Sequence, residues 1–208
     1  MKFTDLNTTL VALEGADAGV YAPAPLALHH YACHGVDSGN TELPVSQVLY
    51  ALAIANRCRT IVETGINNCA GATMWLAHAA SINKGTYTGF DVDVRAARTA
   101  HALLKRVSPQ LSGEIVHGDA LVELPQRFAL GSIDLLFIDD NHTRAHVEAE
   151  VAAFRPCMRP GGLMLFHDVL GVHEHDIWDV IQPLGGIKLV SHYHVAGHEF
   201  GGLGMLPC

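Results

Sequence analysis

Acidic side chains recur at the ends of five short segments of this chain. Each segment is rich in apolar and β-branched residues and reads as a buried strand. A carboxylate at the end of a sheet strand costs desolvation free energy unless a ligand, a metal ion or a hydrogen bond compensates it. Core packing does not require five such acids, so the pattern predicts a ligand site. The acids are Glu63, Asp91, Asp119, Asp139 and Asp168.

The loop that follows Glu63 contains Gly65 and Gly71 and leads into a helical pattern. A glycine at this point lets the backbone approach a ligand closely, and a helix N-terminus offers free N–H groups to a negative group. Asp91 follows at a spacing that suits an acid gripping ribose hydroxyls. Taken alone, the loop is explained equally well by a structural turn between a strand and a helix.

Histidine is in excess, with 14 residues against 13 lysines and arginines together. His142, His146 and Glu150 follow one another at i, i+4 and i+8, which is the spacing of metal ligands on one helix face. The favoured interpretation is that only His142 faces the site and that the other two lie on a solvated helix surface. Residues 173–176, His-Glu-His-Asp, either cover a substrate or form a polar entry into a helix.

The segments around these residues alternate between strand and helix patterns. Such alternation implies right-handed crossovers and a parallel sheet that is covered on both faces. Ligands bind such sheets beyond the carboxyl ends of the strands, where the acids lie. The expected strands are 60–65, 86–92, 113–119, 133–139 and 163–169, and the expected helices are 45–56, 72–80, 95–106, 121–127, one after the fourth strand, and 176–181.

Two further expected strands, 187–195 and 200–206, break the alternation. Only residues 196–199 separate them, which is too short for a crossover helix, so the two strands should form an antiparallel hairpin. Residues 159–162, Arg-Pro-Gly-Gly, predict a turn before the fifth strand. We therefore expect an α/β fold: a Rossmann-like, doubly wound, seven-stranded sheet that is parallel except for a C-terminal antiparallel hairpin.

Length and composition limit the domain organisation and the partners. The chain has 208 residues, of which 49% are hydrophobic, and this suits one α/β domain at 44–208 behind an irregular N-terminal arm at 1–43. The formal charge of -8 argues against nucleic-acid or anionic-lipid partners. Neither a membrane span nor a secretory signal is found, and five scattered cysteines suggest reduced thiols, so we expect a cytoplasmic protein.

The order of the motifs is similar to that of a known family. The chain carries VETG…GAT, GFDVD, HGDA, IDLLFIDDNH and RPGGLMLFHDV before the expected hairpin. Over residues 45–208 this order resembles class I S-adenosylmethionine-dependent methyltransferases. More narrowly, it resembles the natural-product and sugar O-methyltransferases with an Asp-x-x-His and a Pro-Gly-Gly…His-Asp-Val motif. The resemblance implies transfer of a methyl group to a hydroxyl of a small molecule.

The resemblance also implies which residues bind S-adenosylmethionine. Members of the family commonly have a second glycine four residues after the first, where this chain has Cys69. Asn67, which we place among the cofactor-binding residues, can adopt the left-handed backbone that such a turn requires. By the resemblance, Glu63, Gly65 and Gly71 would line the methionine moiety, Asp91 would hold the ribose, and Asp119 and Ala120 would lie beside the adenine.

A divalent metal ion is implied as well, with Asp139, His167 and Asp168 as ligands. A metal ion lowers the pKa of a bound hydroxyl, and the neutral imidazole of His142 would then take the proton as general base. We expect Mg²⁺ or Mn²⁺ rather than Fe²⁺ or Zn²⁺, although the imidazole of His167 suits the softer ions at least as well. The alternative is a metal-free site in which His167 acts directly as acid or base.

Two other classes of function stay open. A nicotinamide-dependent oxidoreductase uses a similar sheet, although these glycines do not make GxGxxG. A catalytically inactive methyltransferase-like binding module is favoured if Cys69 blocks the cofactor loop. Acceptor choice in such folds lies in irregular arms and loops, here 1–43 and 170–178. The low basic content favours small, uncharged or cationic acceptors, and analogy with this class extends to a homodimer.

Overall fold

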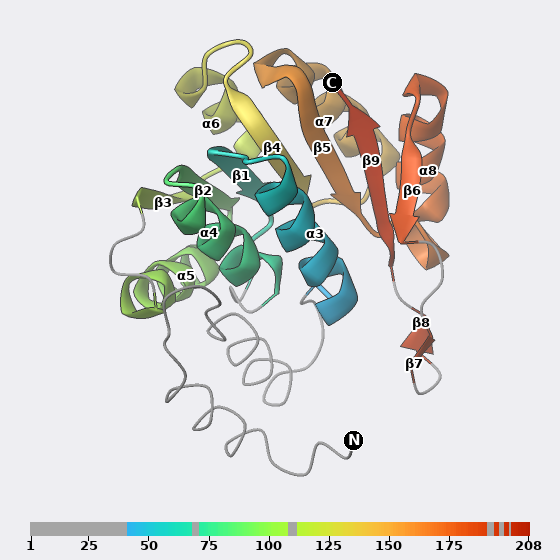
Figure 1. Cartoon of the computed structure of the whole chain (residues 1–208). Coiled ribbons are helices and arrows are strands. Elements are labelled where there is room, and N and C mark those ends of the chain that lie inside the picture. The colour runs from blue at the N-terminus through green and yellow to red at the C-terminus, as the bar shows by residue number, and fades with distance from the viewer. Residues whose placement is uncertain (1–40, 68–70, 108–111, 191–193, 196–197, 200) are drawn as a thin grey trace.

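A seven-stranded sheet runs through the molecule, and helices pack against both of its faces (Figure 1). The computed structural model describes residues 41–67, 71–107, 112–190, 194–195, 198–199 and 201–208. The strand order is β3-β2-β1-β4-β5-β9-β6, and the expected α/β fold is confirmed. Almost all of the expected arm at 1–43 lies outside the described residues, as does Cys69.

Five parallel strands form one side and the centre of the sheet. β1 pairs with β2 on one side and with β4 on the other, and β3 and β5 extend the sheet in the two directions. The chain therefore reverses its winding between β1 and β4, which creates a crevice at the carboxyl ends of these strands. The strands are β1 (Thr60–Thr64), β2 (Thr86–Asp91), β3 (Ser112–His117), β4 (Ile133–Ile138) and β5 (Met158–His167).

Each face of the sheet has its own apolar core. Helices α3, α4 and α5 bury residues such as Leu49, Leu76 and Ala100 against one face. Helices α6, α7 and α8 bury Leu124, Phe154 and Ile181 against the other. Coverage of both faces explains the nearly continuous apolar run of β4. The helices are α3 (Leu43–Ala55), α4 (Ala72–Ile82), α5 (Val94–Val107), α6 (Ala120–Arg127), α7 (Arg144–Phe154) and α8 (Glu174–Ile181), with 3-10 turns at Arg155–Cys157, Gly171–His173 and Gln182–Leu184.

The start of β5 differs from the expectation of a turn at 159–162. β5 begins at Met158 and runs through this segment, with a register shift against β4 between Ile133 and Leu135. Gly161 has a φ of +76°, a left-handed conformation that glycine adopts without strain. The Pro-Gly-Gly sequence therefore forms an irregular first part of the strand, so predicting a separate turn was wrong.

The antiparallel C-terminal hairpin is confirmed, but its strands are shorter than expected. β9 (Leu203–Pro207) pairs antiparallel with both β5 and β6 (Ile187–Val190). In the chain, β7 (His194–Val195) and β8 (His198–Glu199) lie between β6 and β9, and they form a separate two-stranded sheet beyond the end of the main sheet (Figure 1). The connection is therefore longer than residues 196–199. Within the described residues, none of the helices combines the length and apolar character that crossing a membrane requires.

Candidate active site

A cavity of about 730 Å³ opens at the carboxyl ends of the parallel strands, at the winding reversal. Its wall combines the loop after β1, the ends of β2 and β3, and the polar ends of β4 and β5. Glu63 and Gly71 are the predicted site residues that do not line it. The predicted residues that do are Gly65, Asn67, Asp91, Asp119, Ala120, Asp139, His142, His167 and Asp168.

Glu63 lies beneath the cavity and is 2% exposed. The Tyr87 hydroxyl donates to its Oε2 at 2.5 Å, and the Thr73 hydroxyl donates to its Oε1 at 3.1 Å. Burial raises the pKa of Glu63 to about 8, although both hydrogen bonds favour the carboxylate. The side chain therefore joins β1 to β2 and to the first turn of α4, below the loop that carries Gly65.

The loop after β1 needs its unusual backbone. Gly65 has a φ of +75°, and a Cβ atom there would lie 2.1 Å from the carbonyl oxygen of Asp139. Asn67 is also left-handed, with a φ of 44°, and its N–H donates to Asp91 Oδ2 at 2.9 Å. Gly71, the N-cap of α4, packs against Thr41 instead of lining the cavity. These contacts keep the loop close to the ends of β2 and β4.

Asp119 and Ala120 lie where β3 gives way to α6. Asp119 is the N-cap of α6, and its carboxylate accepts the N–H of Leu121 at 2.9 Å, which satisfies a free helix donor. Ala120 is buried at the first helical position. Asp119 therefore both caps the N-terminus of α6 and contributes a carboxylate to the cavity wall.

Asp139 and His167, at the ends of neighbouring strands, are joined in a buried network. His167 Nδ1 lies 3.0 Å from Asp139 Oδ1, and His167 Nε2 lies 2.6 Å from Glu42 Oε2. The Thr41 hydroxyl donates to Asp139 Oδ2 at 2.9 Å. Both nitrogens of the His167 ring therefore face carboxylates, and two oxygens of Asp139 are also occupied.

Sequence reasoning missed Thr41 and Glu42. Glu42 is the N-cap residue of α3, yet its side chain makes no capping hydrogen bond. It reaches His167 instead, and its Oε1 accepts the N–H of Gly201 from the segment before β9. The contact with His167 spans 125 positions of sequence, and no local pattern indicates it.

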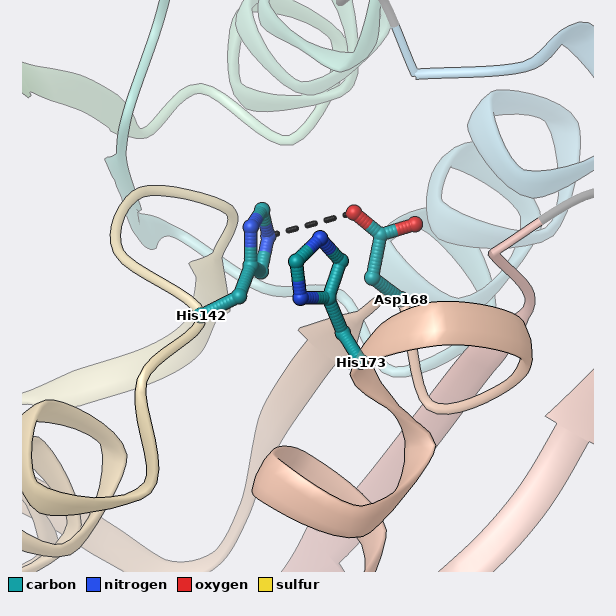
Figure 2. A group of neighbouring side chains, drawn as sticks. All are labelled: His142, Asp168 and His173. Atoms are coloured by element: carbon teal, nitrogen blue, oxygen red, sulfur yellow. Dashed lines mark ion pairs between the residues drawn. The ribbon is translucent and has the colours of Figure 1, made fainter.

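Asp168 and His142 both line the cavity, and their side chains point toward each other (Figure 2). Asp168 is left-handed without being glycine, with a φ of 54°, and such strain clusters at functional sites. His142 Nε2 lies 3.2 Å from Asp168 Oδ2 and 3.6 Å from Asp139 Oδ1. This nitrogen is buried and makes no hydrogen bond to another described residue. It is therefore a polar atom that a substrate group can satisfy.

His173 covers the same place from the 3-10 turn after β5. Its ring stacks on that of His142, with centroids 4.6 Å apart and an interplanar angle of 28°. Figure 2 shows the His173 ring beside both His142 and Asp168. Of the two interpretations of residues 173–176, the arrangement favours the one in which this segment overhangs the site.

The charges of the site depend on one another. Burial lowers the pKa of His167, but the Asp139 charge and contacts with Asp168 and Glu42 raise it well above its usual value. Burial likewise lowers the pKa of His142, and Asp139 and Asp168 more than offset this, so its pKa is raised. Burial raises the pKa values of Asp139 and Asp168, whereas the two imidazoles lower them and determine the net direction.

The donor set fits a divalent metal ion. One ligand atom each from Asp139, His167 and Asp168 lies within 4.8 Å of the others, and His167 Nδ1 is 3.0 Å and 3.5 Å from the two Oδ1 atoms. Octahedral ligands at ordinary bond lengths are about 3.0 Å apart along an edge. Glu42 would then accept the Nε2–H of a metal-bound imidazole, which is the usual outer support of a histidine ligand.

The interpretation of Glu150 as a residue of a solvated helix surface was wrong. Its side chain is completely buried under the loop after β4, and His146, on the same face of α7, is half-buried and lines the cavity. The helix therefore turns this polar face inward, toward Asp140.

Comparison with known proteins gives a family. A family model described as a methyltransferase domain matches residues 62–169, just over half of the chain. No curated protein matches. Three solved structures resemble this chain at less than 25% identity, so they show the fold alone.

The first is an O-methyltransferase from Bacillus cereus in complex with SAH, at 16% identity, 97% coverage of this chain, 96% of that chain and a TM-score of 0.71. The second is cofactor-bound Rv0187 from MTB, at 22% identity, 94% coverage of each chain and a TM-score of 0.68. The third is the O-methyltransferase TomG from Streptomyces achromogenes in complex with SAM, at 17% identity, 96% coverage of this chain, 94% of that chain and a TM-score of 0.66.

Proposed function

Because the chain belongs to the methyltransferase-domain family of S-adenosylmethionine-dependent enzymes, we propose that it methylates a hydroxyl of a small molecule, with His142 as general base and a divalent metal ion at Asp139, His167 and Asp168. The O-methyltransferases among the similar structures support the choice of oxygen as acceptor. The family match favours methyl transfer over a nicotinamide-dependent reaction.

One observation carries the proposal: His142, whose Nε2 lies 3.2 Å from Asp168 Oδ2, shares a cavity with the metal-ligand group and with the loop after β1. S-adenosylmethionine supplies a methyl group on a positively charged sulfur. Gly65, Asn67 and Asp91 line the part of the cavity suited to this cofactor, and Asp119 and Ala120 line its continuation. Base and cofactor loop therefore border one space, as alignment for transfer requires.

His142 removes the proton as the acceptor oxygen forms its bond to carbon. The hydroxyl O–H bond breaks toward Nε2 of His142, and the bond between carbon and sulfur breaks as the new bond between carbon and oxygen forms. Without a metal ion, Asp139 and Asp168 raise the pKa of His142 above that of an exposed imidazole, which makes it a stronger base. A cation bound by these two carboxylates would oppose that rise. Asp168, 3.2 Å from Nε2, stabilises the imidazolium that results.

A bound metal ion would lower the pKa of the acceptor hydroxyl. Asp139 and Asp168 would bind it through carboxylate oxygens, and His167 through Nδ1. Two carboxylates with one imidazole suit Mn²⁺ as well as Mg²⁺. Glu42 would keep the Nε2 proton of His167 and leave Nδ1 free to bind.

Equilibrium titration with S-adenosylmethionine and S-adenosylhomocysteine tests the cofactor. We expect saturable binding of both to the wild-type chain. An absence of binding at millimolar cofactor would overturn the proposed function.

The base is tested by His142→Ala, with His175→Ala as the control because the side chain of His175 is 89% exposed. We expect His142→Ala to keep its cofactor affinity and to lose turnover by roughly 10²-fold or more across a panel of phenols, catechols and sugars. His175→Ala should behave as wild type. Unchanged turnover in His142→Ala would remove this residue from the mechanism.

A further inference from the structure

A second polar group lies beside the site and has no role in the proposed reaction. Both carboxylate oxygens of Glu150 are buried without a well-formed hydrogen bond among the described residues, although Asp140 and Thr64 lie close enough to shift its pKa, and His146 Nε2 is likewise buried without one. Buried polar atoms in native proteins are almost always paired, and an orphaned set needs an explanation such as a bound water or ion. The three atoms come from side chains one turn apart on α7.

Asp140 completes the group from the loop after β4. Its Oδ2 lies 3.5 Å from His146 Nε2, and Glu150 Oε1 lies 3.9 Å from the same nitrogen. One ligand atom from each of the three residues lies within 4.8 Å of the others. The fully buried Glu150 carboxyl is thus directed into a cluster that contains a second carboxylate and a single imidazole.

A bound cation would change the protonation of this group. Burial, and after it the Asp140 charge, raises the pKa of Glu150 to about 10, so without a cation this carboxyl keeps its proton at neutral pH. A divalent ion would displace that proton and bind the resulting carboxylate together with Asp140 and His146. It would thereby satisfy the buried atoms that have no hydrogen-bond partner.

We propose that Asp140, His146 and Glu150 form a second divalent-cation site, separate from the group of Asp139, His167 and Asp168 and independent of the proposed reaction. A mixed set of imidazole and carboxylate ligands suits a first-row ion such as Mn²⁺ better than Mg²⁺. Asp140 and His146 line the cavity, so an ion has a path to the site. When bound, it would tie α7 to the loop that carries His142.

Titration of the full chain with Mn²⁺, followed by electron paramagnetic resonance of the free ion, tests this site. We expect wild type to bind two ions, Glu150→Gln to lose one, and Asp168→Asn to lose the other. Glu148→Gln is the matched control, because Glu148 lies on the same helix with a 57% exposed side chain, and it should bind as wild type. His146→Gln is the second variant and should weaken the same ion as Glu150→Gln, by about tenfold or more.

Melting curves of each variant in a chelator and in Mn²⁺ accompany the titration and verify folding. Loss of one ion in Glu150→Gln with no loss in Asp168→Asn would support the second site and contradict the metal in the proposed function. If Glu150→Gln and His146→Gln both bind Mn²⁺ with the wild-type number and affinity, the group holds only water or a shared proton and the proposal is overturned. Failure of S-adenosylmethionine to bind would leave this result unaffected.

Discussion

Glu42 shows how one residue connects distant parts of the chain to the site. Its side chain contacts His167 at 2.6 Å and Gly201 at 3.1 Å, although all three lie far apart in sequence. A carboxylate at Nε2 determines which nitrogen of the imidazole keeps its proton and orients the ring. Since Glu42 does not cap α3 with its side chain, its replacement leaves the hydrogen bonds of that helix unchanged.

We predict that Glu42→Ala weakens Mn²⁺ binding to the group of Asp139, His167 and Asp168 by about tenfold to a hundredfold. The measurement is the Mn²⁺ titration in a Glu150→Gln background, which leaves a single proposed site. Glu42→Gln keeps an oxygen acceptor and should recover part of the affinity, and Glu123→Ala on α6 serves as a control. Equal affinities for Glu42→Ala and its parent would contradict this role.

Glu63 gives the stability of the protein a pH dependence. The pKa of Glu63 rises from 4.5 to about 8 because of burial, so the folded state holds a proton that the unfolded state releases between these values. Fewer protons on the unfolded state mean that stability falls as pH rises through this window. We predict that the free energy of unfolding of the wild type falls by an amount on the order of 1–3 kcal/mol between pH 5 and pH 8 because of Glu63. Glu63→Gln, which cannot ionise, should not show this decrease.

Urea denaturation at the two pH values, compared between wild type and Glu63→Gln, measures this difference. Glu114→Gln is the control, because Glu114 has a 58% exposed side chain at the edge of the sheet. An identical pH dependence in wild type and Glu63→Gln would show that Glu63 is ionised in the folded protein.

At the scale of elements, the site depends on how closely the loop after β1 approaches the end of β4. Gly65 and Gly171 have similar left-handed φ angles of 75° and 70°. A Cβ atom at Gly65 would overlap the Asp139 backbone, whereas a Cβ atom at Gly171 would meet nothing within 4 Å. Substituting alanine at Gly171 therefore measures the free-energy cost of the left-handed backbone alone. The same substitution at Gly65 adds the cost of the steric overlap with Asp139.

We predict that Gly171→Ala costs only the left-handed strain, about 1–2 kcal/mol, and leaves affinity for S-adenosylhomocysteine unchanged. Gly65→Ala should cost more and should weaken that affinity at least about tenfold, because the loop must move away from β4. Urea denaturation and calorimetric titration of both variants provide the two values. Equal affinities in the two variants would show that the loop is not part of the cofactor site.

The elements of the sheet were predictable because each strand has a local pattern, and parallel order then places their ends together. The contact between Asp139 and His167, which follow or end the neighbouring parallel strands β4 and β5, was predictable for that reason. The support from Glu42 was not predictable, since it depends on how α3 docks across the sheet. The burial of the polar face of α7 was not predictable either. Polar residues at helical spacing indicate a solvent-exposed face, and the sequence does not show that Asp140, from the loop after β4, lies against this one.

At the scale of the whole molecule, the acidic balance of the chain is concentrated at the cavity. Seven carboxylates line it together with three histidines, of which His142 and His167 have raised pKa values, and no lysine or arginine lines it among the described residues. Such a wall attracts cations and repels anions over distances comparable to the Debye length. The cationic sulfonium of the proposed cofactor and divalent ions are favoured by this field, and anionic acceptors are disfavoured.

We predict that an aromatic acceptor with an amine substituent has a lower KM than its analogue with a carboxylate, by about tenfold at low ionic strength. The ratio should shrink as salt is added, because screening weakens interactions between charges that water reaches. Steady-state kinetics with a matched catechol amine and catechol acid at two salt concentrations measure it. Asp93→Asn, a change at the exposed rim of the cavity, should lower the ratio while leaving the metal-ligand group intact. A lower KM for the carboxylate acceptor than for the amine would contradict the prediction. It would mean that bound cations make the electrostatic potential of the cavity positive, so that these ions select the substrate more than the side chains do.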